Sequence, residues 1–375
     1  MRLQLTELVL VNYRNYAEQS LEFGAFNLFV GANAQGKTNL LEAILFLATT
    51  RSHRTSTDDE LIRQGEQTGY LSGSVEDSIA RRRIEVGNTR GRRKQVKLDG
   101  KIQNRLSNLI GLLKVVFFAP ESTAIVKGGP DDRRRFLDSL ISQVHGEYLR
   151  GLQRYRRALQ QRNESLKQIR DRRASRDTLQ AWEEPLIASG IDVARRRRAV
   201  CEELRPVLLQ QQQYLTEGCE EAGLRYAPNV LINEDDEESR EEFERRLTAS
   251  VESDIARGTT SVGPHRDDVE LMVDGLDARR FASQGQQRTL TLALKLAEID
   301  WMHRASGELP IVLLDDVTSE LDELRTRLLF EALHALPPQV FLTTTRIDPT
   351  LFGEMPAHAW EVRAGTANPV EADAA

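Results

Sequence analysis

The sequence predicts an α/β protein with a mixed sheet flanked by helices, an antiparallel β part and an inserted helical arm. Short apolar runs such as Phe26–Val30 and Ile311–Leu314 are each followed by a helix-like pattern, which is typical of buried strands in an α/β sheet. Residues 69–98 alternate polar and apolar side chains, as an antiparallel meander does. From Pro130 to about residue 225 the apolar spacing is helical, which predicts the arm.

The composition is that of an ordinary soluble protein. The 375 residues are 40% hydrophobic and 29% charged, enough for two domains or one domain with a large insertion. A formal net charge of −6 means that any contact with nucleic acid needs a local basic patch. Cys201 and Cys219 have no metal-type spacing, which favours a reducing, cytoplasmic compartment. No run approaches the ~20 apolar residues of a membrane helix, so we expect no membrane anchor.

Two strands are expected before residue 31, at 3–11 and 26–30, joined by the segment NYRNY and a polar turn. In that segment Tyr13, Arg14 and Tyr16 either line a nucleotide or DNA site or simply cover the sheet edge. Farther on, Ser52, His53 and Arg54 lie in a polar loop that is either a phosphate contact or only solvated.

The stretch GANAQGKT matches the pattern G-x-x-x-x-G-K-[ST] and lies between an apolar strand and a helix. We interpret its two glycines as positions where the backbone takes turns closed to residues with a side chain. Successive N–H groups would then converge on phosphate, with the lysine at the β- and γ-phosphates and the threonine hydroxyl at Mg²⁺. The predicted phosphate-binding loop consists of Gly31, Ala32, Asn33, Ala34, Gln35, Gly36, Lys37 and Thr38. The alternative is a chance glycine turn.

In the antiparallel part we expect hairpin turns at Gly87–Asn88 and Asp99–Gly100. In the arm, Pro185 and Gly190 indicate a break between two long helices. The run Arg195–Arg198 is expected on a solvated face, with DNA contact as the alternative.

The strand Ile311–Leu314 ends in two adjacent acids, Asp315 and Asp316. Buried charges are costly unless they are ligated or solvated, so the pair predicts function. We expect Asp315 to hold Mg²⁺ beside Thr38, and Asp316 to orient or deprotonate the attacking water. Because aspartate is one methylene shorter than glutamate, slow turnover is expected.

A third element, SQGQQ, comes just before a long amphipathic helix. Its serine, glycine and amides form an anion site at a helix N-terminus, or a simple N-cap. One nucleotide cannot easily lie at two distant helix N-termini of a single head, so we expect this segment to serve a second subunit.

These motifs, in the order GANAQGKT, SQGQQ, IVLLDD and SELD, resemble the Walker A, signature, Walker B and D-loop elements of an ABC-type P-loop ATPase head. The stretches PESTAIVKGGPDDRRRFLD, GPHRDDVEL, SQGQQRTLTLALKLAE and LLDDVTSELDELR together resemble the bacterial RecF family of DNA replication and repair proteins, which is similar to SMC and Rad50 heads.

The resemblance implies an ATP-dependent homodimer with Mg²⁺. Residues 31–38 of one subunit would face Ser283, Gly285 and Gln286 of the other, and Asp322 would communicate across the interface. It further implies a weak, DNA-dependent ATPase that acts on single-stranded and duplex DNA and their junctions, with RecR and RecO as partners. We expect residues 1–130 and 258–375 to form the head and 131–257 the arm.

The sequence departs from the general ABC pattern in three places. Gln284 replaces a signature glycine, Thr343 to Thr345 stand where a switch histidine is usual, and Glu121 or a neighbour would replace the Q-loop glutamine. The sequence argues against three other classes of protein. A transporter ATPase would lack the arm, an SMC or Rad50-like protein would carry a long coiled coil, and a small-molecule kinase would lack SQGQQ and SELD.

Overall fold

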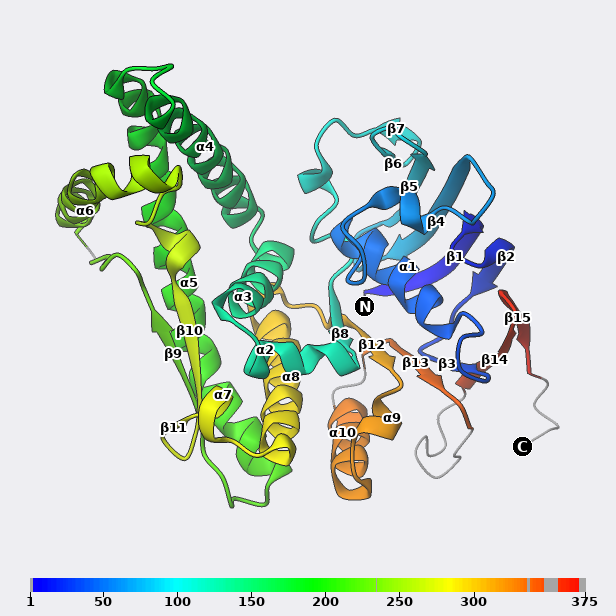
Figure 1. The fold of residues 1–375 in the computed structure, drawn as a ribbon. Helices are drawn as coiled ribbons and strands as arrows, with labels where there is room; N and C mark the ends of the chain where they lie inside the picture. Colours follow the sequence, from blue (N-terminus) through cyan, green and yellow to red (C-terminus); the bar gives the residue numbers. More distant parts are fainter. Residues whose placement is uncertain (1–2, 234, 336–337, 347–356, 371–375) are drawn as a thin grey trace. The chain divides into compact units, whose positions relative to one another are not determined.

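The computed structural model describes residues 3–233, 235–335, 338–346 and 357–370. It divides into two compact units, the first formed by Met1–Ser122 and Leu292–Ala375 and the second by Thr123–Thr291 (Figure 1). Helix α8 (Gln284–Ser306) begins in the second unit and ends in the first. The predicted arm, residues 131–257, lies within the second unit, and the domain boundaries at its two ends remain a prediction.

The first unit contains a six-stranded mixed sheet that carries the apolar runs seen in the sequence. Neighbouring strands of this sheet are parallel, with one exception: the edge strand β15 (Thr366–Pro369) is antiparallel to its neighbour β14 (Ala357–Arg363). The strands β12 and β13 are buried along their whole length, which explains why their sequences are continuously apolar. In spatial order the strands are β15 (Thr366–Pro369), β14 (Ala357–Arg363), β3 (Phe26–Val30), β13 (Val340–Thr344), β12 (Ile311–Asp315) and β8 (Val115–Phe118).

A second six-stranded sheet of the same unit is antiparallel. Its inner side chains and helix α1 (Lys37–Thr49) belong to one hydrophobic core, which also contains Leu313 of β12. The two sheets therefore hold α1 between them. In spatial order the strands are β2 (Tyr16–Glu22), β1 (Gln4–Tyr13), β4 (Thr68–Glu76), β5 (Arg81–Thr89), β6 (Gln95–Leu98) and β7 (Lys101–Ile102).

Short helices complete the first unit: α9 (Val317–Glu320), α10 (Glu323–Ala335) and the 3₁₀ turns η1 (Asp58–Leu61), η2 (Leu106–Asn108) and η3 (Pro120–Thr123). Helices α9 and α10 follow β12 and lead to β13, a helical crossover of the kind that connects neighbouring parallel strands.

The second unit is mainly helical, with α4 and α5 running side by side as a long hairpin (Figure 1). A small antiparallel sheet in the order β11-β10-β9 packs beside α5. The elements are α2 (Ala124–Lys127), α3 (Pro130–Val144), α4 (Gly146–Arg170), η4 (Arg176–Leu179), α5 (Gln180–Leu215), β9 (Ala222–Ala227), α6 (Asp236–Arg257), η5 (Pro264–Arg266), β10 (Asp268–Val273), β11 (Leu276–Asp277) and α7 (Ala278–Phe281).

The predicted α/β fold with a mixed sheet, an antiparallel β part and a helical insertion is confirmed. Three details were wrong. The helical pattern expected to reach about residue 225 ends with α5 at Leu215, and the strand β9 begins at Ala222. A strand, β2, follows the NYRNY segment and was missed because most of its side chains are exposed on a sheet edge. The turn expected at Gly87–Asn88 does not exist, since Gly87 pairs with Tyr70 on one side and Gln95 on the other. The turn at Asp99–Gly100 is confirmed.

The predicted helix break at Pro185 and Gly190 is also wrong, because α5 runs through both residues. Burial of Leu186 and Ile187 directly after the proline holds the helix to its neighbours and outweighs the lost backbone hydrogen bond. Gly190 is a packing position. A Cβ there would lie 2.9 Å from Cε2 of Phe243, so glycine lets the helices approach closely.

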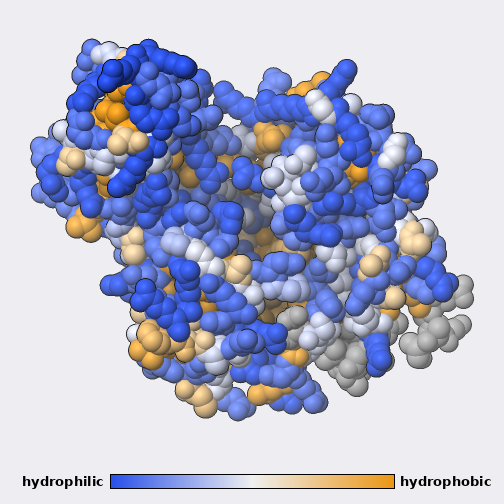
Figure 2. All heavy atoms as spheres, viewed as in Figure 1, coloured by the Kyte–Doolittle hydropathy of each residue, from blue (hydrophilic) through white to orange (hydrophobic). Residues whose placement is uncertain are grey.

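Figure 2 shows one face covered mostly by hydrophilic residues, with the hydrophobic ones in small separate groups. Among the described residues, no helix has the length and apolar character needed to span a bilayer.

Candidate functional site

The two glycines of the phosphate-binding loop are required for different reasons. Gly36 has φ +120°, a conformation that residues with a side chain rarely adopt. Gly31 has no positive φ, so the interpretation that its own turn requires glycine was wrong. A Cβ on Gly31 would instead lie 2.3 Å from the carbonyl oxygen of Val362, and the close approach of β14 excludes a side chain. Ala34 takes a left-handed φ of 64° between them.

Lys37 and Thr38 open helix α1, directly after the loop. The Lys37 ammonium donates to the carbonyl oxygens of Gly31 and Ala32, at 2.5 and 2.9 Å, so it lies inside the curve of the loop. Burial lowers the pKa of Lys37, and the nearby carboxylates Asp316 and Asp315 act in the opposite direction. Thr38 donates its hydroxyl to Oδ1 of Asp315 at 3.0 Å.

Asp315 ends β12 beside the loop, and Asp316 follows in a left-handed conformation with φ 50°. Burial raises the pKa of Asp315, while hydroxyl donors on Thr343 and Thr38 oppose that effect. The structure therefore brings Lys37, Thr38 and the two acids together at the carboxyl end of the sheet. This is where α/β proteins bind ligands.

Four residues support the loop, and of these only Tyr16 was among the candidates from the sequence. Asn15 donates from Nδ2 to the carbonyl oxygen of Gln35 at 2.8 Å, and Tyr16 donates its hydroxyl to the carbonyl oxygen of Gly36. The backbone N–H groups of Ala364 and Gly365 donate to the side chain and the carbonyl oxygen of Gln35. No local pattern could reveal the contacts of Ala364 and Gly365, because the turn after β14 is more than 300 residues from the loop in sequence.

Arg14 was one of the candidate nucleotide or DNA contacts, and it lines an open pocket of about 480 Å³. Its guanidinium makes two hydrogen bonds with the carboxylate of Glu42, at 2.8 and 2.7 Å. Burial raises the pKa of Glu42, but hydrogen bonds from Arg14 and Ser52 outweigh it, so the pKa is lowered overall. The pocket is lined by Arg14, Asn15, Asn39, Arg54, Asp59, Glu60, Ile62, Gln64 and Arg90.

The other candidates near Arg14 have mixed outcomes. Tyr13 and Tyr16 are 2% and 0% exposed and belong to the hydrophobic core, so they neither line an open site nor simply cover the sheet edge. Arg54 reaches the pocket and donates to Oδ1 of Asn39 at 2.9 Å. His53 packs against the ring of Phe117, and burial lowers its pKa.

The signature residues Ser283, Gly285 and Gln286 lie in the second unit, at the start of α8. The amide oxygen of Gln286 accepts from the N–H of Ser283 at 2.9 Å, and the Ser283 hydroxyl accepts from the N–H of Gln286. This reciprocal pair caps the helix, as the structural alternative expected. Gly285 is exposed beside them, which leaves the backbone open to a ligand.

Asp322 directly precedes α10 and accepts from the N–H of Arg325 at 2.9 Å, so it caps that helix. That backbone hydrogen bond lowers the pKa of Asp322, and the ion pair with the Arg325 side chain adds to it. Glu121, the proposed substitute for a Q-loop glutamine, is exposed in η3 and acts electrostatically on Asp315 and His53.

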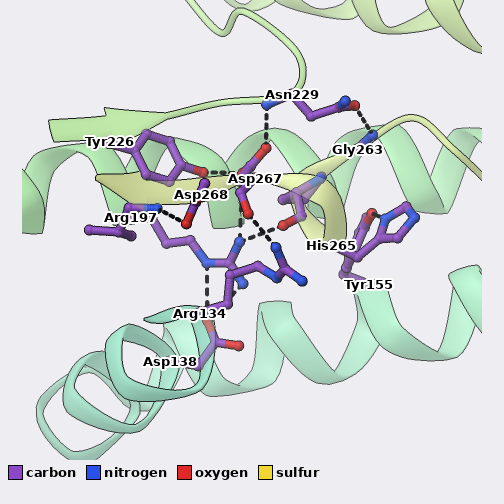
Figure 3. A network of polar contacts seen from close by, with 12 residues as sticks. Arg134, Asp138, Tyr155, Arg197, Tyr226, Asn229, Gly263, His265, Asp267 and Asp268 are labelled. Atoms are coloured by element: carbon purple, nitrogen blue, oxygen red, sulfur yellow. Dashed lines mark hydrogen bonds and ion pairs between the residues drawn. The ribbon is translucent and has the colours of Figure 1, made fainter. Parts of the chain in front are cut away.

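The second unit contains a buried polar network that explains the stretches RRRFLD and GPHRDD (Figure 3). Arg197 is its centre. The guanidinium donates to Asp138 Oδ1 at 2.8 Å and to the carbonyl oxygen of Pro264 at 2.6 Å, and it lies 3.6 Å from Asp267 Oδ2. The expectation that Arg195–Arg198 lies wholly on a solvated face was therefore wrong, since the side chain of Arg197 is 3% exposed.

Asp267 is the second centre of the network (Figure 3). It accepts from the Tyr226 hydroxyl and, at 2.6 Å, from the N–H of Asn229. Burial raises the pKa of Asp267 against these contacts. Next to it, Arg133 of α3 pairs with both carboxylate oxygens of Asp268, at 2.7 and 2.9 Å. The network thus ties α3 and α5 to the start of β10.

The described residues hold no group of three or more His, Cys, Asp or Glu side chains that could bind a metal alone. A magnesium ion does not need such a group, since it commonly takes one or two protein oxygens and completes its shell with phosphate and water. The hydroxyl of Thr38 and the carboxylate of Asp315, 3.0 Å apart, are ligands of the right chemistry for that ion.

Residues 4–362 match the family model described as the RecF/RecN/SMC N terminal domain. The protein is similar to "DNA replication and repair protein RecF" of Geobacillus kaustophilus, with 42% identity over 92% of this chain and 93% of the relative. The RecF protein of Lactococcus lactis subsp. cremoris (strain MG1363) also has 42% identity, over 92% of this chain and 93% of the relative. The chain belongs to the RecF family. The resemblance read from the motifs is confirmed.

Comparison with solved structures agrees with this family assignment. The "recombination mediator protein RecF-ATPrS in RecFOR pathway" has a TM-score of 0.90 and 33% identity, covering 98% of both chains. The corresponding RecF-ATP structure has the same TM-score with 32% identity, again over 98% of both chains. An Smc head from Pyrococcus furiosus, with a TM-score of 0.57 and 18% identity over 98% of this chain and 96% of the other, shares the fold. The ABC-type head fold expected from the motifs is thereby confirmed.

Proposed function

We propose that this RecF-family chain is an ATP-dependent DNA-binding protein of recombinational repair and replication-fork maintenance. ATP holds two copies together as a homodimer, the dimer clamps DNA at single-strand to double-strand junctions, and slow hydrolysis resets it. The observation that carries the proposal is the hydrogen bond of 3.0 Å between Thr38 and Asp315, which joins the phosphate-binding loop to the acidic strand end. The likeness to the RecF-ATP structure supports ATP as the nucleotide.

Each residue of the site has a proposed part. The loop N–H groups of residues 31–38 and the ammonium of Lys37 bind the phosphates, and Thr38 and Asp315 hold Mg²⁺. Bound there, the ion neutralises charge on the β- and γ-phosphates. Asp316 orients the attacking water and accepts its proton. The Asp316 carboxylate is electrostatically coupled to Lys37, which supports its place beside the phosphates.

The second copy completes the site in this proposal. Ser283, Gly285 and Gln286 of one protomer contact the nucleotide bound by the loop of its partner, and Asp322 couples the two sites. The exposure of Ser283, Gly285 and Asp322 supports an interface role, because all three are open to a partner in the single chain. The capping pair of Ser283 and Gln286 keeps the helix N-terminus ordered for an anion.

We expect DNA to be bound through its phosphates, and affinity therefore to fall steeply with salt. RecR and RecO are the proposed protein partners, supported by the assignment of the similar solved structures to the RecFOR pathway. A cytoplasmic location is proposed because the DNA lies there. Helping to load the recombinase at gaps is the proposed outcome.

The test is the assembly state by light scattering, with ATP, ADP or no nucleotide and with duplex DNA. Wild type is expected to dimerise only with ATP and to gain DNA affinity when it does. Lys37→Met and Ser283→Arg are expected to stay monomeric, whereas Ser253→Arg, an exposed serine on α6, is the matched control and should dimerise. A monomer that binds DNA equally under every nucleotide condition would refute the clamp.

A further inference from the structure

Thr343 lies between the two elements of the nucleotide site. It is the fourth residue of β13, is fully buried, and is paired with Asp315 of β12 on one side and Phe29 of β3 on the other. The strand β3 leads into the phosphate-binding loop, and β12 ends in the two acids. No other strand of the mixed sheet is hydrogen-bonded to both within the described residues.

The Thr343 hydroxyl uses its donor and one acceptor at the same time. It donates to Oδ1 of Asp315 at 2.7 Å and accepts from the backbone N–H of Asp316 at 2.9 Å. One side chain therefore holds the carboxylate of the first acid and the backbone of the second.

The two contacts have different consequences for the acids. Oδ1 of Asp315 receives hydroxyl hydrogen bonds from Thr343 and Thr38, and neither contact involves Oδ2. The carboxylate is thereby held in one orientation. Asp316 has φ 50° and ψ 33°, a left-handed conformation that non-glycine residues rarely take, and the bond to Thr343 holds the N–H in that conformation.

We propose that Thr343 is a positioning residue for both acids: it orients Asp315 toward the metal and sets the backbone from which Asp316 acts. This rests on the proposed function of the site. Thr343 occupies the segment where ABC heads usually carry a switch histidine. In this chain the segment instead holds the carboxylate of Asp315 and the backbone N–H of Asp316 through hydrogen bonds.

The neighbouring residue offers a matched control. Thr344 is also buried, but its hydroxyl donates to the carbonyl oxygen of Arg346, away from both acids. Valine has the branched shape of threonine without the hydroxyl, so Thr343→Val and Thr344→Val each remove one buried hydroxyl from β13. Thr343→Ser keeps the hydroxyl and loses a methyl group.

The experiment measures Mn²⁺ affinity by electron paramagnetic resonance of the free ion, in the presence of a non-hydrolysed ATP analogue. Nucleotide affinity is measured separately in EDTA, and thermal unfolding without nucleotide reports on folding. Loss of a hydrogen-bonding partner behind a metal ligand typically weakens metal binding about 10- to 100-fold. We expect that loss for Thr343→Val, with nucleotide affinity in EDTA unchanged, and restoration to within about threefold of wild type for Thr343→Ser.

The results separate the two proposals. If Thr343→Val binds Mn²⁺ as tightly as wild type, or no more weakly than Thr344→Val, the positioning role is wrong while the proposed function stands. If wild type binds no nucleotide, the proposed function fails and the role of Thr343 fails with it. If Thr343→Val unfolds at a much lower temperature than wild type, the test rests on Thr343→Ser. A folded serine variant whose Mn²⁺ affinity is more than about tenfold below that of wild type also overturns the proposal.

Discussion

Asp138 and Arg197 form a buried ion pair in the second unit. Nη2 of Arg197 lies 2.8 Å from Oδ1 of Asp138, and the side chains are 3% and 9% exposed respectively. Burial acts to lower the pKa of Arg197, but Tyr148, Asp138, Tyr226 and Asp267 outweigh it and raise the pKa, so the guanidinium stays charged. A buried charge of this kind depends strongly on its partner.

We expect Asp138→Asn to lower the free energy of unfolding by about 3 kcal/mol, because the guanidinium loses its main counter-charge while Asp267 stays 3.6 Å away. Urea unfolding followed by circular dichroism measures the change. Arg196→Gln, at an exposed neighbour in the same run, should stay within about 0.5 kcal/mol of wild type. Equal unfolding midpoints for the two variants would contradict the buried ion pair.

Gly190 and Gly151 make a matched pair of helical glycines. A Cβ at Gly190 would meet the rings of Phe243 and Tyr155 at 2.9 and 3.2 Å, whereas one at Gly151 meets only Nη2 of Arg154 at 3.9 Å. Gly190→Ala is therefore expected to destabilise by roughly 1–3 kcal/mol through overpacking. Gly151→Ala should stabilise by about 0.5–1 kcal/mol through helix propensity. Chemical unfolding of both variants measures the sign of the change in the free energy of unfolding. Changes of the same sign in the two variants would contradict the different packing of the two glycines.

His265 is held as a neutral imidazole. Nε2 contacts the carbonyl oxygen of Thr260 at 2.9 Å, which can only accept, so Nε2 carries the hydrogen and Nδ1 accepts from the Tyr155 hydroxyl. Burial lowers the pKa of His265 to about 4; a hydrogen bond to Thr260 and the charge of Asp254 oppose this, while Arg266 and Arg134 add to it.

Because the folded pKa of His265 is below its usual value, the unfolded chain binds a proton first as pH falls. The free energy of unfolding should therefore drop between about pH 6.5 and 4, by as much as about 3 kcal/mol from this residue. His265→Gln keeps an acceptor for Tyr155 and a donor for Thr260 but does not titrate. Urea unfolding of both proteins from pH 7 to 4.5 should give converging stabilities, because only wild type loses the contribution of His265 as the pH falls and the other titrating groups are common to both proteins. Parallel curves would show that His265 is not held neutral.

Replacing Asp315 or Asp316 by asparagine is expected to impair two different properties of the protein, metal binding and hydrolysis. Asp315→Asn should weaken Mn²⁺ binding, because it removes a charged ligand beside Thr38. Asp316→Asn should keep Mn²⁺ and nucleotide but lower the hydrolysis rate about 100-fold or more, the usual contribution of a general base. Single-turnover hydrolysis and Mn²⁺ titration separate the two effects. A hydrolysis rate of Asp316→Asn equal to that of wild type would show that Asp316 is not the general base.

Much of the geometry of the candidate site could be predicted because its residues stand in short, fixed patterns. The strand-loop-helix context around residues 31–38 is as predicted, and the apolar strand does end at Asp315 on the carboxyl edge of the sheet. The pairing of Thr38 with Asp315 follows from both lying at that edge. The errors arose where a residue type has two meanings, as for Gly190, a packing position that was read as a helix break.

By itself, the sequence determined the class of fold and the family, and it predicted a phosphate-binding loop at residues 31–38, because these depend on local periodicity and on spacing along the chain. Only the tertiary structure decided that Val362 excludes a side chain at Gly31, that Thr343 holds both acids and that Arg197 is buried against Asp138. These are contacts between segments far apart in sequence, and burial depends on what packs against a residue rather than on its neighbours in the chain.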